Sequence, residues 1–161
     1  REPLSLFVDH AAPLKEKLGA VLWQLPPRFR FQKERLEEFC VLLSTLPRSK
    51  DIRHAFEFRE STWLSPEAFR ILEEFHFAFC IAHGSGLPFI ERVTSDAVYL
   101  RLHGGEVLYG SNYSERELKD WVKKLFFWEE RRKTVFVYFN NDAFGFAIKN
   151  ALVLKELLVS K

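Results

Sequence analysis

The clearest signal for the fold lies in residues 97–139, AVYLRLHGGEVLYGSNYSERELKDWVKKLFFWEERRKTVFVYF. The first six residues of this stretch (AVYLRL) and its last six (TVFVYF) have the length and apolar, β-branched composition of buried strands. Between them, Ser114 and Glu117 form a capping box, which predicts a helix over about 115–130. Its apolar positions recur at helical spacing: Leu118, Trp121, Val122 and Leu125. A strand, a helix and a second strand in this order predict a parallel βαβ unit.

The same order of elements recurs towards the N-terminus. Further strands are expected at about 20–25 (AVLWQL), 53–59 (RHAFEFR) and 77–82 (FAFCIA). Further helices are expected at 33–45, from Ser65 and Pro66 to about Phe75, and from about Phe146 to Leu158. The pattern predicts one α/β domain over residues 1–161, with five parallel strands that are neighbours in chain order.

Composition excludes several classes of protein. Twenty-four basic and 22 acidic residues leave a net charge of +2, and 47% of the residues are hydrophobic, which is the composition of a soluble globular domain. A net charge this close to zero gives no electrostatic reason to expect nucleic-acid binding. No apolar run of about 18 residues is present, so no membrane span is expected. Cys40 and Cys80 lie in apolar segments and are expected to be buried thiols of a cytoplasmic protein. The chain begins at Arg1 and lacks methionine, which indicates a fragment with further residues upstream.

Motifs for nucleotide binding are missing where they would be expected. Pro26 and Pro27 follow the first strand, where a dinucleotide-binding fold has its glycine-rich turn. No GxxxxGK[ST] sequence occurs anywhere in the chain. A doubly wound nucleotide-binding fold is therefore disfavoured.

Polar side chains collect at the carboxyl ends of the predicted strands. Alternation along a strand places Arg101 and His103 on the face of Tyr99, and Glu57 and Arg59 on the face of Ala55. By the same alternation we assign Gln24, His83 and Asn140, with Tyr138, to this polar face. Polar groups at one end of one face are typical of the mouth of a (β/α) barrel. The alternative for Glu57 and Arg59 is a buried ion-pair network that only satisfies polar groups. Because a closed barrel has eight strands, five strands indicate the C-terminal five units of a TIM-type barrel.

Four motifs carry a family resemblance. They are LGAVLWQLPPRF (18–29), HAFEFRESTWL (54–64), VYLRLHGG (98–105) and VYFNNDAFGFAIKNALVL (137–154). In this order they resemble the DUF72 family, also called YecE-like, whose barrel proteins have no established activity. The resemblance implies that these strands are the fourth to eighth of the barrel. His83 stands where the family commonly has an aspartate.

Three kinds of site are consistent with these residues. A metal site of a hydrolase or isomerase could combine Glu57, His83 and His103, since a carboxylate and two imidazoles suit zinc or manganese. A non-catalytic binding domain could use Trp63 and Tyr113 as exposed aromatic side chains, although packing at the start of a helix is the favoured interpretation of Trp63.

The third kind of site, an enzyme site for a small polar or anionic substrate that resembles a phosphate or a sugar, is the one we favour. We assign Glu57 as the general acid or base and His103 as its partner. The residues expected to bind the substrate are Gln24, Arg59, His83, Arg101, Gly104, Tyr138, Asn140, Asn141 and Asp142. The alternative for Asn140, Asn141 and Asp142 is a turn and a helix cap. The sequence identifies neither a cofactor nor an oligomeric state.

Two structural expectations complete the analysis. Glu57 is expected to contact Arg59 or Arg101, because a carboxylate beside guanidinium groups stays ionised. Five phenylalanines on the predicted helices are expected to be core residues: Phe39, Phe69, Phe75, Phe126 and Phe127.

Overall fold

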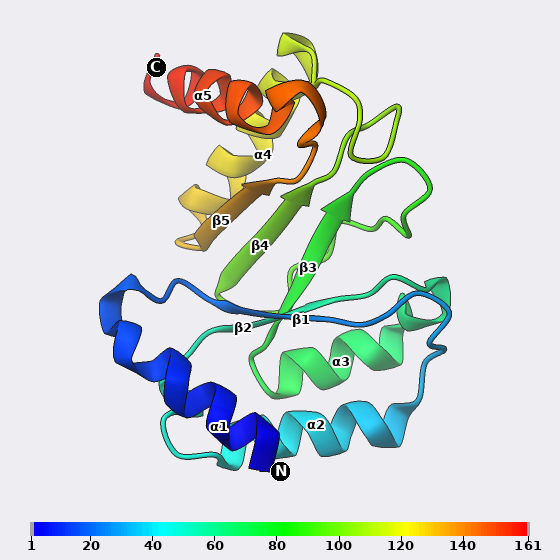
Figure 1. Ribbon diagram of the computed structural model, residues 1–161, viewed down its shortest axis with the longest axis vertical. Helices are drawn as coiled ribbons and strands as arrows, with labels where there is room; N and C mark the ends of the chain where they lie inside the picture. The colour runs from blue at the N-terminus through cyan, green and yellow to red at the C-terminus, as the bar shows by residue number, and fades with distance from the viewer. Residues whose placement is uncertain (1, 161) are drawn as a thin grey trace. The chain divides into compact units, whose positions relative to one another are not determined.

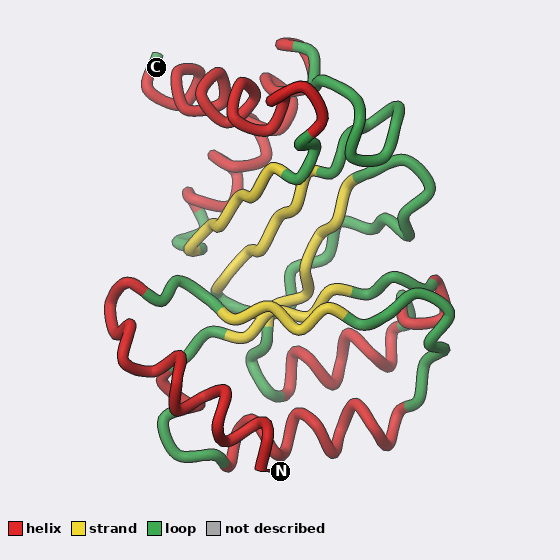
Figure 2. The backbone as a smooth tube through the Cα atoms, viewed as in Figure 1, coloured by secondary structure: helices red, strands yellow, loops and turns green. Residues whose placement is uncertain are grey.

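The computed structural model of the protein describes residues 2–160, in which a helix follows every strand except β3, which a loop connects to β4 (Figures 1 and 2). The main elements are α1 (Glu2–Ala11), β1 (Val21–Gln24), α2 (Lys33–Thr45), β2 (His54–Glu57), α3 (Pro66–Glu74), β3 (Ala78–His83), β4 (Ala97–Leu102), α4 (Glu115–Glu130), β5 (Thr134–Phe139) and α5 (Phe146–Val159). Short 3-10 turns lie at Ala12–Lys17, Ser49–Asp51, Ser61–Trp63 and Ala143–Gly145.

The five strands form one sheet in the order β1-β2-β3-β4-β5, and every neighbouring pair is parallel. This confirms the predicted α/β class and the predicted order of the strands. The register aligns Gln24 with Glu57 in the first pair and Arg101 with Tyr138 in the last pair. Paired residues in parallel strands point to the same face, so the register shows which strand-end side chains share a face.

The chain divides into two compact units, which we describe separately. The first comprises the residues up to Phe79 together with Val93–Ser95, and the second comprises Cys80–Arg92 and the residues from Asp96 onward. In the first unit, Thr94 joins its short segment to β3. Its Oγ1 accepts a hydrogen bond from the Phe79 N–H at 2.7 Å and donates one to the Phe77 carbonyl at 2.7 Å.

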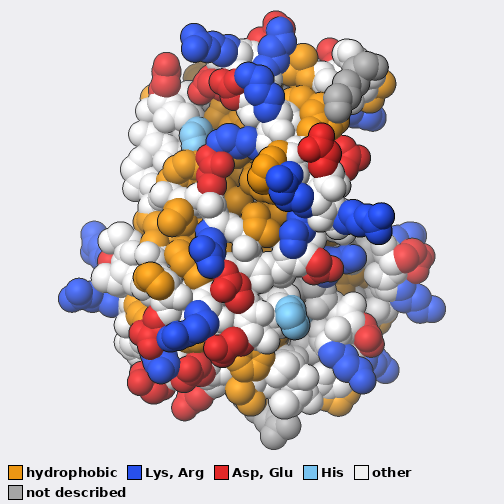
Figure 3. Space-filling model, turned by 180° about the vertical axis from the view of Figure 1, so that it is seen from behind, with side chains coloured by type: hydrophobic (Ala, Val, Ile, Leu, Met, Phe, Trp, Pro, Cys, Tyr) orange, Lys and Arg blue, Asp and Glu red, His pale blue; other side chains and the backbone are white. Residues whose placement is uncertain are grey.

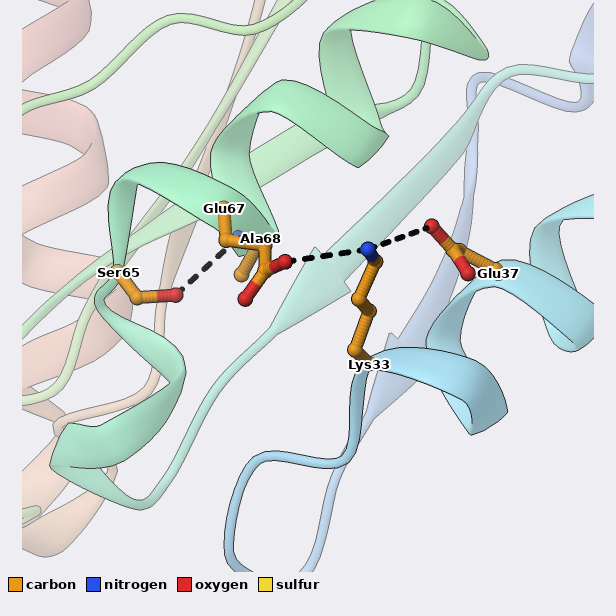
Figure 4. Close-up of polar contacts among 5 residues, drawn as sticks. All are labelled: Lys33, Glu37, Ser65, Glu67 and Ala68. Carbon is orange, nitrogen blue, oxygen red and sulfur yellow. Dashed lines mark hydrogen bonds and ion pairs between the residues drawn. The ribbon is translucent and has the colours of Figure 1, made fainter.

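The helices of the first unit begin where their sequence signals predict. Ser65 caps α3, since its Oγ accepts a hydrogen bond from the Ala68 N–H at 3.1 Å, and Pro66 occupies the first helical position (Figure 4). Lys33 at the start of α2 lies 3.8 Å from Glu37 of its own helix and 3.3 Å from Glu67 of α3 (Figure 4). These exposed ion pairs connect the two helices but contribute little stability.

Aromatic and aliphatic side chains fill the core of the first unit. Phe56 of β2 is fully buried and contacts Phe39 of α2 edge-on, with ring centroids 5.8 Å apart. The buried residues of α2 are Leu36, Cys40 and Leu43, at the predicted helical spacing. Neither cysteine forms a disulfide, and both Cys40 and Cys80 are buried, as predicted.

The second unit is built around β4 and α4. The predicted capping box is present, because Ser114 Oγ accepts from the Glu117 N–H and the Glu117 carboxylate accepts from the Ser114 N–H. The predicted apolar face of α4 is buried, and Trp128 extends it: Leu118, Trp121, Val122, Leu125 and Trp128. Together with Leu100 and Leu102 of β4, both fully buried, these side chains form the core of this unit.

The expected burial of phenylalanine is confirmed at Phe69 and fails at Phe127. Phe39, Phe75 and Phe126 are half-buried, whereas Phe127 is 50% exposed. The error at Phe127 is geometric, since it follows Leu125 by two residues and therefore lies about 200° around the helix from it. The Arg131 guanidinium covers its ring instead, 3.5 Å from the centroid.

Helix α1 is the one main element for which the sequence provided no expectation. Its single buried residue is Val8, and Phe7 remains 47% exposed. With one buried side chain, α1 contributes little to the core. Across residues 2–160, no helix combines the length and the apolarity that crossing a bilayer requires.

Candidate functional site

In the first unit, three predicted site residues lie together at the end of β1 and β2. Glu57 is completely buried and forms an ion pair with the Nε of Arg59, whose side chain is 8% exposed. Arg59 Nη2 also donates to Gln24 Oε1 at 3.4 Å. The expected contact between Glu57 and an arginine is confirmed. A carboxylate and a guanidinium withdrawn from water in this way can bind and orient a polar ligand or exchange a proton with it.

In the second unit, the predicted residues at the ends of β4 and β5 also meet. Arg101 Nε donates to Asn140 Oδ1 at 2.9 Å, and the Asn140 N–H donates to the Leu102 carbonyl at 2.7 Å. Tyr138, which pairs with Arg101 across the strands, is 40% exposed and stacks on the buried Tyr99 with centroids 4.9 Å apart. The amide of Asn140 thus fixes one edge of the guanidinium, so the fork of Arg101 has a defined orientation.

His103 follows β4 directly and is completely buried. The backbone N–H of His103 donates to the His83 carbonyl at 2.7 Å, and the imidazole ring contacts Tyr109 edge-on, with ring centroids 5.4 Å apart. Burial and the contact with Tyr109 restrict the rotation of this imidazole.

The assignment of His83 to the polar face is wrong. His83 pairs with Leu102 across β3 and β4, whereas the residue that pairs with Arg101 is Ala82. Its side chain therefore lies on the face of Leu102, opposite that of Arg101. There its Nδ1 lies 2.8 Å from Tyr113 Oη, and its ring contacts Trp121 of α4 at 5.4 Å. The cause of the error is that FAFCIA is apolar at every position, so alternation alone does not distinguish its faces.

The metal site that combined Glu57, His83 and His103 is contradicted for the same reason. His83 faces away from the side of β4 that carries Arg101, and the imidazoles therefore do not converge from one face. In the part of the chain that the structure describes, no three histidine, cysteine, aspartate or glutamate side chains are grouped as a metal ion would need.

In the turn after β5, Asn141 and Asp142 do not form the ligand-binding turn that the sequence analysis predicted. Asn141 is completely buried, and its Nδ2 donates to the Ser111 carbonyl at 2.9 Å and to Asn150 Oδ1 at 2.8 Å. Asp142 is exposed and makes no side-chain cap to the turn that follows it. The alternative of a structural turn therefore describes Asn141 better than substrate binding does.

The glycine loop after β4 is stabilised by a tyrosine that sequence reasoning placed on the surface. Tyr113 is 2% exposed, and its Oη accepts a hydrogen bond from the Gly104 N–H at 3.0 Å. That amide is consequently engaged within the loop. Gly104 has a φ of +100°, and a Cβ there would lie 2.5 Å from the Val107 carbonyl oxygen, so this position requires glycine.

The exposed aromatic residues expected of a binding domain are absent at the predicted positions. Trp63 is 2% exposed, and its indole N–H donates to the Phe29 carbonyl. Tyr113 is equally buried. Neither side chain has the exposure that the non-catalytic binding hypothesis assigned to it, so these two residues no longer support that hypothesis.

The family profile described as "Protein of unknown function DUF72" matches residues 1–161. The chain belongs to the DUF72 family. The resemblance inferred from the four sequence motifs is thereby confirmed.

Relatives of this DUF72 chain include a curated protein and solved structures. The UPF0759 protein YunF of Bacillus subtilis (strain 168) is 33% identical over 168 residues, which cover 88% of this chain and 58% of that protein. The crystal structure of a DUF72 family protein from Thermotoga maritima superposes with a TM-score of 0.83 at 30% identity, over 98% of this chain and 65% of that one. One from Enterococcus faecalis V583 gives 0.84 at 25% identity, over 99% and 66%. The chain therefore spans about two thirds of their length or less.

The surface charge of the DUF72 chain is mixed. Figure 3 shows lysine and arginine side chains interspersed with aspartate and glutamate, and hydrophobic side chains exposed between them. On the face drawn, no large area carries a single sign of charge, in accordance with the small net charge of +2.

Proposed function

We propose that this DUF72 chain supplies five strand–helix units of a TIM-type barrel, with an enzyme site for a small polar or anionic substrate at the carboxyl ends of its strands. The parallel order of the strands supports the barrel. The two edges of the sheet also support the proposal that these strands are part of a barrel. Within residues 2–160, β1 pairs with β2 alone and β5 pairs with β4 alone, so each edge strand has one side open for a further strand. A closed barrel has no free edges. The buried thiols of Cys40 and Cys80 suit a reducing cytoplasm.

The observation that carries the enzyme proposal is the buried ion pair of Glu57 and Arg59 at the end of β2. Withdrawing two charges from water costs several kcal/mol per ion, so a buried pair is a poor device for stability alone. Strand ends are where TIM-type barrels place their catalytic groups. We assign Glu57 the role of general acid or base, and His103 at the end of β4 the role of the second proton-transfer group.

Arg59 and Arg101 are the groups we propose for binding the substrate. The planar fork of a guanidinium matches phosphate and carboxylate oxygens with two parallel hydrogen bonds. Each fork is oriented by an amide oxygen, that of Gln24 for Arg59 and that of Asn140 for Arg101. Tyr138, exposed beside Arg101, adds a flat apolar surface that suits a sugar ring.

The experiment is a calorimetric titration of the protein with inorganic phosphate, a hexose phosphate and the free hexose. We expect saturable binding of the hexose phosphate, weakened at least tenfold by Arg59→Met and by Arg101→Met. The matched control is Arg116→Met on α4, where the arginine is exposed and lies outside the strand ends. No saturable binding of any of the three compounds, or equal binding by all variants, would overturn the proposal.

A further inference from the structure

A small cavity lies on the helix-covered side of the sheet in the second unit, away from the strand-end residues. It has a volume of about 190 Å³, which equals roughly six water molecules at ~30 Å³ each. One face of α4 provides Glu117, Asp120, Trp121 and Lys124, and His83 and the loop after β3 provide the remaining walls. Because His83 faces away from Arg101, this cavity is independent of the proposed enzyme site.

The charges that line this cavity favour a cation. Glu91, Glu117 and Asp120 contribute three carboxylates, of which Asp120 is paired with the exposed Lys123 at 2.7 Å. Lys124 is the one ammonium in the lining. Burial lowers the pKa of His83, so the imidazole is neutral near pH 7 and adds no positive charge. With both lysines counted, the site remains negative by one charge and attracts cations.

The chain itself places an ammonium group in this cavity. Lys124 Nζ lies 4.6 Å from the centroid of the Trp121 ring and forms an ion pair with the Glu91 carboxylate. An indole face combined with a carboxylate is the arrangement by which proteins recognise ammonium ligands. Trp121 is 5% exposed and therefore held in place, whereas the Lys124 side chain is 37% exposed and can turn outward.

The other walls are aromatic, and Phe89 on the loop after β3 is half-exposed. Phe89 contacts the His83 ring edge-on at 5.3 Å, and His83 contacts Trp121 edge-on at 5.4 Å. Tyr113 Oη, 2.8 Å from His83 Nδ1, fixes the orientation of the imidazole. Aromatic surfaces at right angles form a partial cage, which suits methylated as well as primary ammonium groups.

We propose that this cavity binds a small organic ammonium compound, and that the Lys124 ammonium occupies the same position when the ligand is absent. The ligand cation then lies over Trp121 and pairs with Glu91 and Glu117, while Lys124 turns into solvent. The side chain of Lys124 thus competes with the ligand, and its removal strengthens binding. An anionic ligand would show the opposite dependence, because Lys124 would be its partner.

Choline chloride is the probe, titrated by calorimetry into the protein and into Lys124→Met. We expect Lys124→Met to bind choline at least fivefold more tightly than the unchanged protein, and Glu117→Gln in that background to weaken binding at least fivefold. The matched control is Lys119→Met, five residues earlier on α4 and exposed, where Lys119 pairs with Glu115. It should leave the affinity unchanged.

The neutral isostere 3,3-dimethylbutan-1-ol tests whether charge is required. We expect it to bind at least tenfold more weakly than choline to Lys124→Met. Equal binding of the alcohol, no choline binding by Lys124→Met, or weaker binding by Lys124→Met than by the unchanged protein would each overturn the proposal. These outcomes do not depend on Arg59 or Arg101, so they can be distinguished from failure of the enzyme proposal.

Discussion

Replacing Glu57 by glutamine should destabilise the protein far more than the same change at an exposed ion pair. Glu57 is completely buried, and the Arg59 side chain beside it is 8% exposed. Glutamine keeps the shape of the side chain but leaves the guanidinium without its counter-charge in a site with little water. Removing one partner of a buried pair costs about 3 kcal/mol. For a chain of this length, we expect the melting temperature to fall by roughly 6–12 °C.

Urea denaturation followed by tryptophan fluorescence measures this loss directly. The matched control is Glu37→Gln, whose carboxylate is 43% exposed and 3.8 Å from Lys33, and which should cost no more than about 0.5 kcal/mol. A loss below about 1 kcal/mol for Glu57→Gln, similar to the control, would refute the view that this charge is buried and paired.

A double variant separates stability from function. Glu57→Leu combined with Arg59→Met replaces both charges by apolar groups of similar size, and such replacements are often neutral or stabilising. We expect its free energy of unfolding to return to within about 1 kcal/mol of the unchanged protein. Binding of a hexose phosphate should nevertheless be lost. Retained binding in this variant would show that the pair serves the fold and not the ligand.

Three further predictions concern the buried polar groups. Asn150→Ala should cost about 3 kcal/mol in urea denaturation, because it leaves the buried Tyr113 N–H and the Asn141 amide without their acceptor, whereas Asn112→Ala on the exposed side should cost under about 1 kcal/mol. Burial lowers the pKa of His54, so the unfolded state binds more protons and the free energy of unfolding should fall as the pH drops below about 6.5. His54→Gln should reduce that slope in denaturation curves between pH 5 and 7, and an unchanged slope would contradict it. Burial raises the pKa of Cys40 to about 12, so a thiol reagent should label Cys40 only after unfolding, as mass spectrometry can show.

The sequence predicted the elements well where the signal is local. Ser65 with Pro66 and Ser114 with Glu117 determine where α3 and α4 begin, because the capping groups lie within three residues of the amides they satisfy. Strand order followed from short connections between neighbouring strands. Helix α1 was not among the predicted elements.

The candidate site could be predicted only in part, since its faces depend on pairing between distant residues. Glu57 and Arg59 were placed correctly because β2 alternates between polar and apolar residues near its end. His83 was placed on the wrong face, because its strand is apolar on both faces. Only the register with Leu102 shows to which face the His83 side chain points. For Asn141 the sequence allows either ligand binding or a turn, and its buried partner Asn150 can be identified only from the packing of α5.

The most direct test of the proposed enzyme site is a crystal structure of the protein soaked with a hexose phosphate. We expect density for the phosphate group within hydrogen-bond distance of the Arg59 or Arg101 guanidinium, with Glu57 or His103 facing the sugar. Density found solely at other places, or strand ends that hold ordered water alone at saturating ligand, would contradict a substrate site at the carboxyl ends of these strands.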